Sequence, residues 1–290
     1  MQTINEDIKS GQYKKVYLLY GEESFLKQSY KKKLKEAVAG DDTMNYNYFE
    51  GKGLDVNELI SLSDTMPFFS DKRLIIIEDS GFFKTSSEAL ADYLPMIPDT
   101  TCILFVEDAV DKRNRLFKKV KELGHAAEMK RQDSAQLARW AGTILAQNGR
   151  KITGSSMNLF LERTGDDMEN IRMELEKLIS YTWGRDVITE KDVEAICTVR
   201  VSSRIFEMVA AIVNRQTRKA MDLYEDLLML KEPPMRILFL IARQFNQLLQ
   251  VKELSEKGME RKLIASKLKM QPFVVGKIML QAKTFSKEQI

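Results

Sequence analysis

Short apolar runs that end abruptly limit the possible folds of this chain more than any other pattern in it. Residues 16–20 contain no charged or amide side chain and stop at Gly21. A run of this length without polar alternation predicts a strand buried on both faces, as in a parallel sheet covered by helices. The same pattern, or a weaker form of it, recurs at residues 45–49, 74–77, 102–106 and 126–129.

Amphipathic helical patterns separate these apolar runs. Residues 24–38 carry one apolar stripe, and the triplet Lys31-Lys32-Lys33 lies off that stripe. We interpret the triplet as a solvated face, with a phosphate-binding patch as the alternative. Strands that alternate with helices predict right-handed crossovers and a mainly parallel sheet.

The pattern changes after Lys130. We predict no strand between Asp133 and Ile290, and only helices, which are short at first and longer from about Ser202 onward. The chain is therefore expected to have three domains. They are an α/β domain at residues 1–132, a small helical bundle at residues 133–199 and a third helical domain at residues 200–290.

The composition excludes several classes of active site. The 290 residues include two cysteines and one histidine, too few for a disulfide framework, a thiolate metal site or a histidine pair. Cys102 and Cys197 lie in apolar stretches and are expected to be reduced and buried. His125 is interpreted as an ordinary side chain at a strand start. We expect no metal and no cofactor.

The N-terminal residues and the length of the apolar runs bear on the location of the protein, and the net charge bears on its partners. The first six residues lack the charged and apolar regions of a signal peptide, and no apolar run is long enough to span a membrane. A cytoplasmic protein is therefore expected. The net charge is +3, from 45 basic and 42 acidic side chains, so the composition permits DNA contact without requiring it.

Gly21 lies where a phosphate-binding loop would begin, between a buried strand and a helix. Such a loop has a glycine, four residues, a second glycine, a lysine and then serine or threonine. Lys27 falls in register with the phosphate lysine, but Leu26 replaces the second glycine. Gln28 replaces the hydroxyl that would bind magnesium. The match is therefore degenerate.

The replacements at Leu26 and Gln28 are unfavourable for nucleotide binding. The second glycine lets the backbone approach phosphate closely, and leucine places a branched side chain there. Glu22 and Glu23 would also repel a triphosphate from the helix N-terminus. We interpret the loop as a nucleotide-hydrolase architecture without its chemistry. The alternative is an unrelated α/β fold with a chance Gly-to-Lys spacing.

Three stretches of the chain carry a family resemblance. They are residues 17–26, residues 165–167 with 174–181, and residues 204–207 continuing through Ala220 and Pro233 to Ile237-Leu238. In order and spacing, these stretches resemble the delta subunit family of bacterial DNA polymerase III clamp loaders along the length of the chain.

The resemblance implies an AAA+-like fold, with a lid-like second domain and a helical collar as the third. It implies a subunit without catalysis of its own in a DNA-directed DNA polymerase complex. Its partners would be the sliding clamp (beta subunit), other loader subunits through the collar, and primed DNA within the assembled loader. Family members usually continue for several helices beyond the position of Ile290, so the collar is expected to be incomplete.

The connector before residues 74–77 is apolar, although connectors are usually polar. Asp55 and Glu58 have the spacing of a capping box for a helix that Pro67 would stop. The connector then places Phe68 and Phe69 side by side. From the pattern alone, the alternative is that one or both rings fold back under the sheet as core residues.

The family resemblance assigns this connector a role. In the family, a hydrophobic pair at this junction inserts into a pocket on the sliding clamp and holds the ring open. The match falls on Phe68 and Phe69, with Met66 and Pro67 shaping the tip. Nucleotide would then act through neighbouring loader subunits.

Two alternative functions remain open at this point. The first is a nucleotide-binding AAA+ ATPase or switch protein with an atypical phosphate loop, against which Leu26 argues. The second is a DNA-binding protein that uses its basic helices, for which duplex affinity would fall steeply with salt. We find no Ser-Arg-Cys motif after residues 102–106, so an arginine supplied to a neighbour's ATP is not expected.

Overall fold

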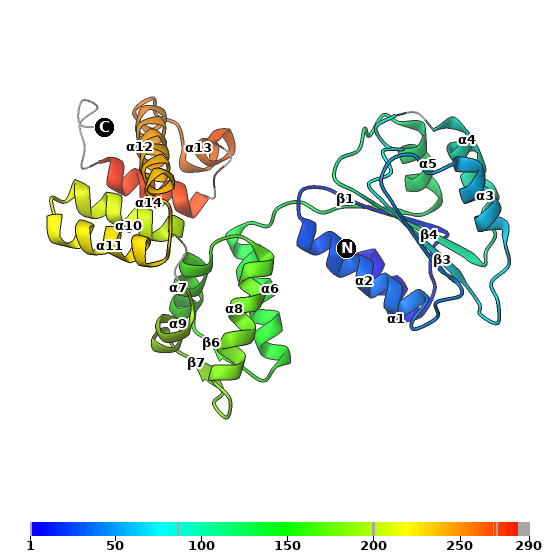
Figure 1. Ribbon diagram of the computed structural model, residues 1–290, viewed down its shortest axis with the longest axis horizontal. Coiled ribbons are helices and arrows are strands. Elements are labelled where there is room, and N and C mark those ends of the chain that lie inside the picture. Colours follow the sequence, from blue (N-terminus) through cyan, green and yellow to red (C-terminus); the bar gives the residue numbers. More distant parts are fainter. Residues whose placement is uncertain (1, 86, 199–200, 269, 271, 284–290) are drawn as a thin grey trace. The chain divides into compact units, whose positions relative to one another are not determined.

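The computed structural model describes residues 2–85, 87–198, 201–268, 270 and 272–283. It divides into two compact units, Met1–Arg131 and Gln132–Ile290 (Figure 1). The boundary near residue 131 lies where the sequence pattern changes. The further division of the second unit into two domains stays a prediction, and the last residues of the chain, 284–290, lie outside the described residues.

A five-stranded parallel sheet forms the centre of the first unit. Its order is β2-β3-β4-β1-β5, so β1 lies between the last two strands of the sequence. The five predicted strands are confirmed, and no end differs from the prediction by more than one residue. Their bounds are β1 (Val16–Tyr20), β2 (Tyr46–Glu50), β3 (Arg73–Glu78), β4 (Thr101–Glu107) and β5 (His125–Glu128).

Helices cover both faces of this sheet (Figure 1). Because side chains alternate along a strand, Val16, Leu18 and Tyr20 enter the core on one face, while Tyr17 points to the other. There the Tyr17 hydroxyl donates to Asp7 at 2.7 Å. The first face carries α3 (Val56–Asp64), α4 (Glu88–Tyr93), a 3₁₀ turn (Leu94–Met96) and α5 (Arg115–Leu123), and the second carries α1 (Gln2–Ser10) and α2 (Ser24–Val38).

Two expectations about local structure need correction. The Asp55 side chain does cap α3, but it accepts the amide of Asn57 at 2.8 Å, so the predicted box with Glu58 is wrong. Two short strands, β6 (Lys151–Ile152) and β7 (Val187–Ile188), pair in parallel in the second unit, which was expected to contain only helices. A ladder two residues long is too short to produce a periodic sequence signal.

The second unit is otherwise helical. Residues of its last five helices form one apolar core, which includes Val209, Leu227, Ile237, Leu248 and Ile278. The helices of this unit are α6 (Ser134–Gln147), α7 (Gly154–Thr164), α8 (Met168–Tyr181), α9 (Glu190–Ile196), α10 (Val201–Val213), α11 (Thr217–Met229), α12 (Pro234–Glu256), α13 (Arg261–Leu268) and α14 (Pro272–Ala282). Among the described helices, none is both long and apolar enough to cross a membrane.

The parallel sheet places the two candidate sites at opposite edges. These sites are the phosphate-loop position at Gly21 and the connector that carries Phe68 and Phe69. All five strands run the same way, so their carboxyl ends meet at one edge and their amino ends at the other. Glu78 is the last residue of β3, and the loop at Gly21 and Asp108 directly follow β1 and β4, so all three lie at the carboxyl edge. The connector between α3 and β3, together with Asn45 just before β2, lies at the amino edge.

Candidate functional site

The loop between β1 and α2 is too short to wrap a phosphate. Helix α2 begins at Ser24, so Leu26, Lys27 and Gln28 are helical, and only residues 21–23 form the loop. Within the loop, the amide of Gly21 donates to the carbonyl of Glu107 at 3.3 Å, and the amide of Glu23 donates to that of Met129 at 3.0 Å. Two amides that a phosphate loop would direct at its ligand are thus bonded to the protein's own backbone.

Gly21 has a structural role that the sequence pattern did not reveal. Its φ is +127°, and a Cβ at this position would lie 2.4 Å from the carbonyl oxygen of Met129. Only glycine permits both this backbone conformation and this close approach. The first glycine of the degenerate loop is therefore explained by the packing of the chain against the segment after β5.

Lys27, the counterpart of a phosphate lysine, is bonded inside the protein. Its side chain is buried, and its Nζ bonds the carboxylate of Asp108, just beyond β4. The same Nζ donates to the Glu107 carbonyl at 3.4 Å. The hydrogen bond from Lys27 lowers the pKa of Asp108 below its ordinary value. The lysine charge is thus neutralised by a carboxylate at the position where it would otherwise face phosphate.

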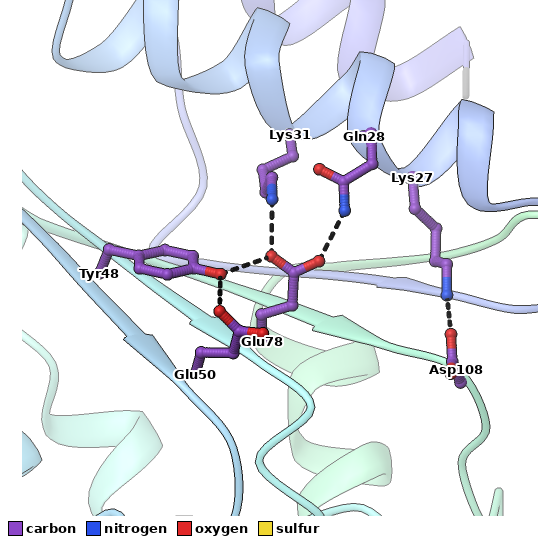
Figure 2. A network of polar contacts seen from close by, with 7 residues as sticks. All are labelled: Lys27, Gln28, Lys31, Tyr48, Glu50, Glu78 and Asp108. Atoms are coloured by element: carbon purple, nitrogen blue, oxygen red, sulfur yellow. Dashed lines mark hydrogen bonds and ion pairs between the residues drawn. The ribbon is translucent and has the colours of Figure 1, made fainter. Parts of the chain in front are cut away.

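Glu78 is the centre of a second polar network at this edge (Figure 2). The Lys31 ammonium and the Gln28 amide each donate to its carboxylate at 2.6 Å. The Tyr48 hydroxyl lies 3.1 Å from Glu78 and 2.9 Å from Glu50, so it can donate to either. Lys31 was expected on a solvated face, and this part of the lysine-triplet interpretation is wrong. Gln28, where a magnesium-binding hydroxyl would stand, instead ties α2 to the end of β3.

The Glu78 network predicts a pH-dependent contribution to stability. Burial alone would raise the pKa of Glu78, but the hydrogen bonds and charge of Lys31, with the bond from Gln28, outweigh it and lower this pKa. A lowered folded-state pKa stabilises the protein at neutral pH, and this stabilisation is lost as pH falls through that value. We expect Glu78→Gln to reduce the free energy of unfolding by about 1 kcal/mol at pH 7.

Denaturant unfolding at pH 7 and at about pH 3 measures this effect. The difference in the free energy of unfolding between wild type and Glu78→Gln should disappear at the lower pH. Glu122→Gln is the matched control, because Glu122 pairs with Lys119 on the exposed surface of α5 and should matter little at either pH. A gap of equal size at both pH values would contradict the assigned ion pair.

The tip, defined as residues 66–69, projects from the amino edge of the sheet. Phe69 is 96% exposed, Phe68 58% and Met66 77%, while Pro67 is half-buried. The two rings contact each other edge to face, with centroids 4.5 Å apart. The alternative in which one or both rings are core residues is therefore wrong. A paired aromatic surface of this kind is a typical protein-contact element.

Sequence reasoning missed the residues that hold this tip. Asn45 and Arg73, both buried, bond the backbone of residues 65, 66 and 68. Met44, beside Asn45, adds a further exposed apolar side chain. No local pattern identifies these residues, because Asn45 meets Phe68 only after β2 and β3 have paired. Within the described residues, no group of three or more His, Cys, Asp or Glu side chains could hold a metal ion.

The strand order and the helices on both faces define a protein with an AAA+-like α/β domain, in which the loop between β1 and α2 and the side chain of Lys27 are bonded within the protein. Residues 17–130 match the family described as DNA polymerase III, delta subunit, and residues 202–290 match the DNA polymerase III delta subunit, C-terminal domain. The chain belongs to the DNA polymerase III delta subunit family.

Individual relatives are similar along nearly the whole chain. The DNA polymerase III subunit delta of Bacillus subtilis (strain 168) is 28% identical over 98% of this chain and 86% of the relative. A probable DNA polymerase III subunit delta of Aquifex aeolicus (strain VF5) is 24% identical over 84% of this chain and 72% of the relative. The solved structure of the Bacillus subtilis DNA clamp loader delta protein (YqeN) is 27% identical, with a TM-score of 0.73, and the match covers 99% of this chain and 88% of that one.

Proposed function

We propose that this chain is a clamp-loader subunit that binds the sliding clamp through its tip and holds the ring open for loading on primed DNA. The observation that carries the proposal is the exposure of two adjacent aromatic rings, Phe68 and Phe69, on a connector fixed to the sheet edge. The likeness to a DNA clamp loader delta protein of solved structure, which is 27% identical to this chain, supports the same role.

The energetics of the tip support such an interface. Full burial of one phenylalanine side chain is worth about 1.5–3 kcal/mol of transfer free energy. The backbone of Phe68 is bonded to Asn45, so it loses little further freedom on binding, and more of this free energy is available for association. A few central aromatic side chains commonly dominate an interface in this way.

Ring opening needs no chemistry from this chain. A subunit that binds the open clamp more tightly than the closed clamp shifts the equilibrium toward the open form by that difference in affinity. We propose that the chain has no ATPase activity, because its loop amides and Lys27 are bonded internally. Nucleotide would then act through neighbouring subunits of the loader, and the chain would work in the bacterial cytoplasm.

The helical second unit supports a proposed assembly role. Met229, at the end of α11, is 82% exposed, and Met235 and Phe239, one turn apart on α12, are 75% and 66% exposed. Residues four apart lie on the same face of a helix, so α12 presents an apolar strip. We assign the exposed apolar side chains of Met229, Met235 and Phe239 to contact with other loader subunits. Contact with primed DNA is expected within the assembled loader.

A titration of the full chain with the sliding clamp of its own organism tests the proposal. We expect binding without nucleotide, the same affinity when ATP is present, and no saturable binding of a fluorescent ATP analogue at micromolar concentration. The internal bonds of Gly21, Glu23 and Lys27 are the reason for the last two results. Absence of clamp binding would refute the proposal, and salt-sensitive binding of duplex DNA without clamp binding would favour a DNA-binding protein.

A further inference from the structure

Asn45 bonds the tip backbone with both ends of its side chain. Its Nδ2 donates to the carbonyl of Phe68 at 2.8 Å, and its Oδ1 accepts the amide of Phe68 at 2.7 Å. The side chain is 1% exposed, so these bonds are shielded from water. Asn45 therefore holds Phe68 much as a neighbouring strand would, although the tip belongs to no strand.

Asp42 fixes the orientation of the Asn45 side chain. Its Oδ2 accepts the second proton of the Asn45 Nδ2 at 2.7 Å, and its Oδ1 accepts the backbone amides of Met44 and Asn45 at 2.9 and 3.1 Å. The Asn45 amide nitrogen thus faces two acceptors, and its oxygen faces one donor. Only one orientation of the amide satisfies all three partners.

Arg73 holds the other side of the tip. Its guanidinium donates to the carbonyls of Thr65 at 3.2 Å and Met66 at 3.3 Å, and to the side-chain oxygen of Asn47 at 3.1 Å. Thr65 follows the last residue of α3, where carbonyls lack helical partners and a positive charge is favourable. Arg73 is itself the first residue of β3, so it ties the end of α3 to the rigid sheet.

Phe69 directly follows the residue that Asn45 holds, and its own backbone conformation is uncommon. Its φ is +50°, in the left-handed region that residues with a side chain rarely occupy. Such a conformation persists only where its surroundings impose it, and it is common at ligand-binding positions. In this conformation the Phe69 ring lies in solvent and stays in contact with the ring of Phe68.

We propose that Asn45 is a positioning residue that, with Arg73, holds Phe68 and Phe69 in their clamp-binding arrangement before the clamp arrives. This inference rests on the proposed clamp-binding function. A free connector would sample many conformations, and ordering it on binding would reduce the affinity. Asn45 removes that cost from its buried position beneath the tip, because it holds the backbone of Phe68, whose ring contacts that of Phe69.

Asn45→Ala in the full chain tests the inference by titration with the sliding clamp of the same organism. We expect the affinity to fall about tenfold or more, because the connector must then be ordered on binding. Amide hydrogen exchange at Phe68 should become faster in the free protein, since that amide loses its acceptor. The matched control is Ser80→Ala, which removes a buried hydroxyl bonded to Glu107 at the opposite sheet edge and should leave clamp affinity unchanged.

A double-variant measurement separates positioning from a general loss of stability. If Asn45 acts through the rings, Asn45→Ala should weaken binding less when Phe69→Ala is already present. Asn45→Asp keeps the side-chain shape and the bond from the Phe68 amide, but places an oxygen against the Phe68 carbonyl and Asp42. Asn45→Asp should also weaken clamp binding, and it replaces Asn45→Ala in the titration if Asn45→Ala does not fold.

The outcomes distinguish this inference from the proposed function. If folded Asn45→Ala or Asn45→Asp binds the clamp like wild type while Phe68→Ala with Phe69→Ala does not, the positioning role is overturned and clamp binding by the tip stands. If the double phenylalanine variant also binds like wild type, the proposed function fails first. Additive effects in the double-variant measurement would likewise overturn the positioning role.

Discussion

Replacing Phe68 and Phe69 together by alanine should remove clamp binding and leave the fold intact. Burial of both rings is worth about 3–6 kcal/mol, so their loss should weaken the affinity about a hundredfold or more. Both side chains are exposed in the free protein, and exposed substitutions usually change stability by only about 0.5 kcal/mol. Calorimetric titration with the clamp measures the first effect, and thermal unfolding measures the second.

Trp183→Ala is the control for this double variant. Trp183 is 83% exposed and lies between α8 and β7, so its removal deletes another large exposed aromatic ring without touching the tip. It should leave the clamp affinity unchanged. Wild-type affinity in Phe68→Ala with Phe69→Ala would contradict clamp binding through the tip. A marked fall in melting temperature would indicate that the rings stabilise their own unit.

Gly21→Ala should destabilise the first unit strongly, although it deletes no contact. The added Cβ would meet the Met129 carbonyl oxygen at 2.4 Å, and alanine is strained at a φ of +127°. Backbone strain and overpacking together cost about 3 kcal/mol or more. For a unit of this size, that corresponds to a fall of roughly 10 °C in melting temperature, measurable by scanning calorimetry.

Gly142→Ala is the matched glycine replacement, and it is expected to raise stability where Gly21→Ala lowers it. Gly142 lies inside α6, and an added Cβ meets nothing within 4 Å. Alanine there should stabilise the second unit by about 0.5–1 kcal/mol. If Gly21→Ala melts like wild type, the close approach to Met129 does not restrict the loop, and the glycine would need another explanation.

The strands of the first unit were predictable because their signal is local. Residues 16–20, 74–77 and 102–106 are continuous apolar runs, and the observed strands β1, β3 and β4 contain them. Helices α1 and α4 were not predicted. Helix α4 has only six residues, which is less than two turns and gives little periodicity.

The pairings of charged side chains were not predictable from the sequence. Lys31 and Glu78 belong to α2 and the end of β3, and Lys27 and Asp108 to α2 and the segment after β4. These partners meet only because the strand order places β1 beside β4 and β4 beside β3. A lysine on a helix has the same sequence pattern whether it faces solvent or a carboxylate across a sheet edge.

The alternation of strands and helices, the parallel sheet and the loss of the second glycine at Leu26 follow from residues close together in the chain, so they could be read from local patterns. Whether Phe68 and Phe69 are core or surface could be established only from the folded structure. Their exposure depends on whether any other element covers the connector, and on Asn45, which β2–β3 pairing brings to Phe68. Burial and long-range hydrogen bonds are properties of the assembled fold, so no local pattern encodes them.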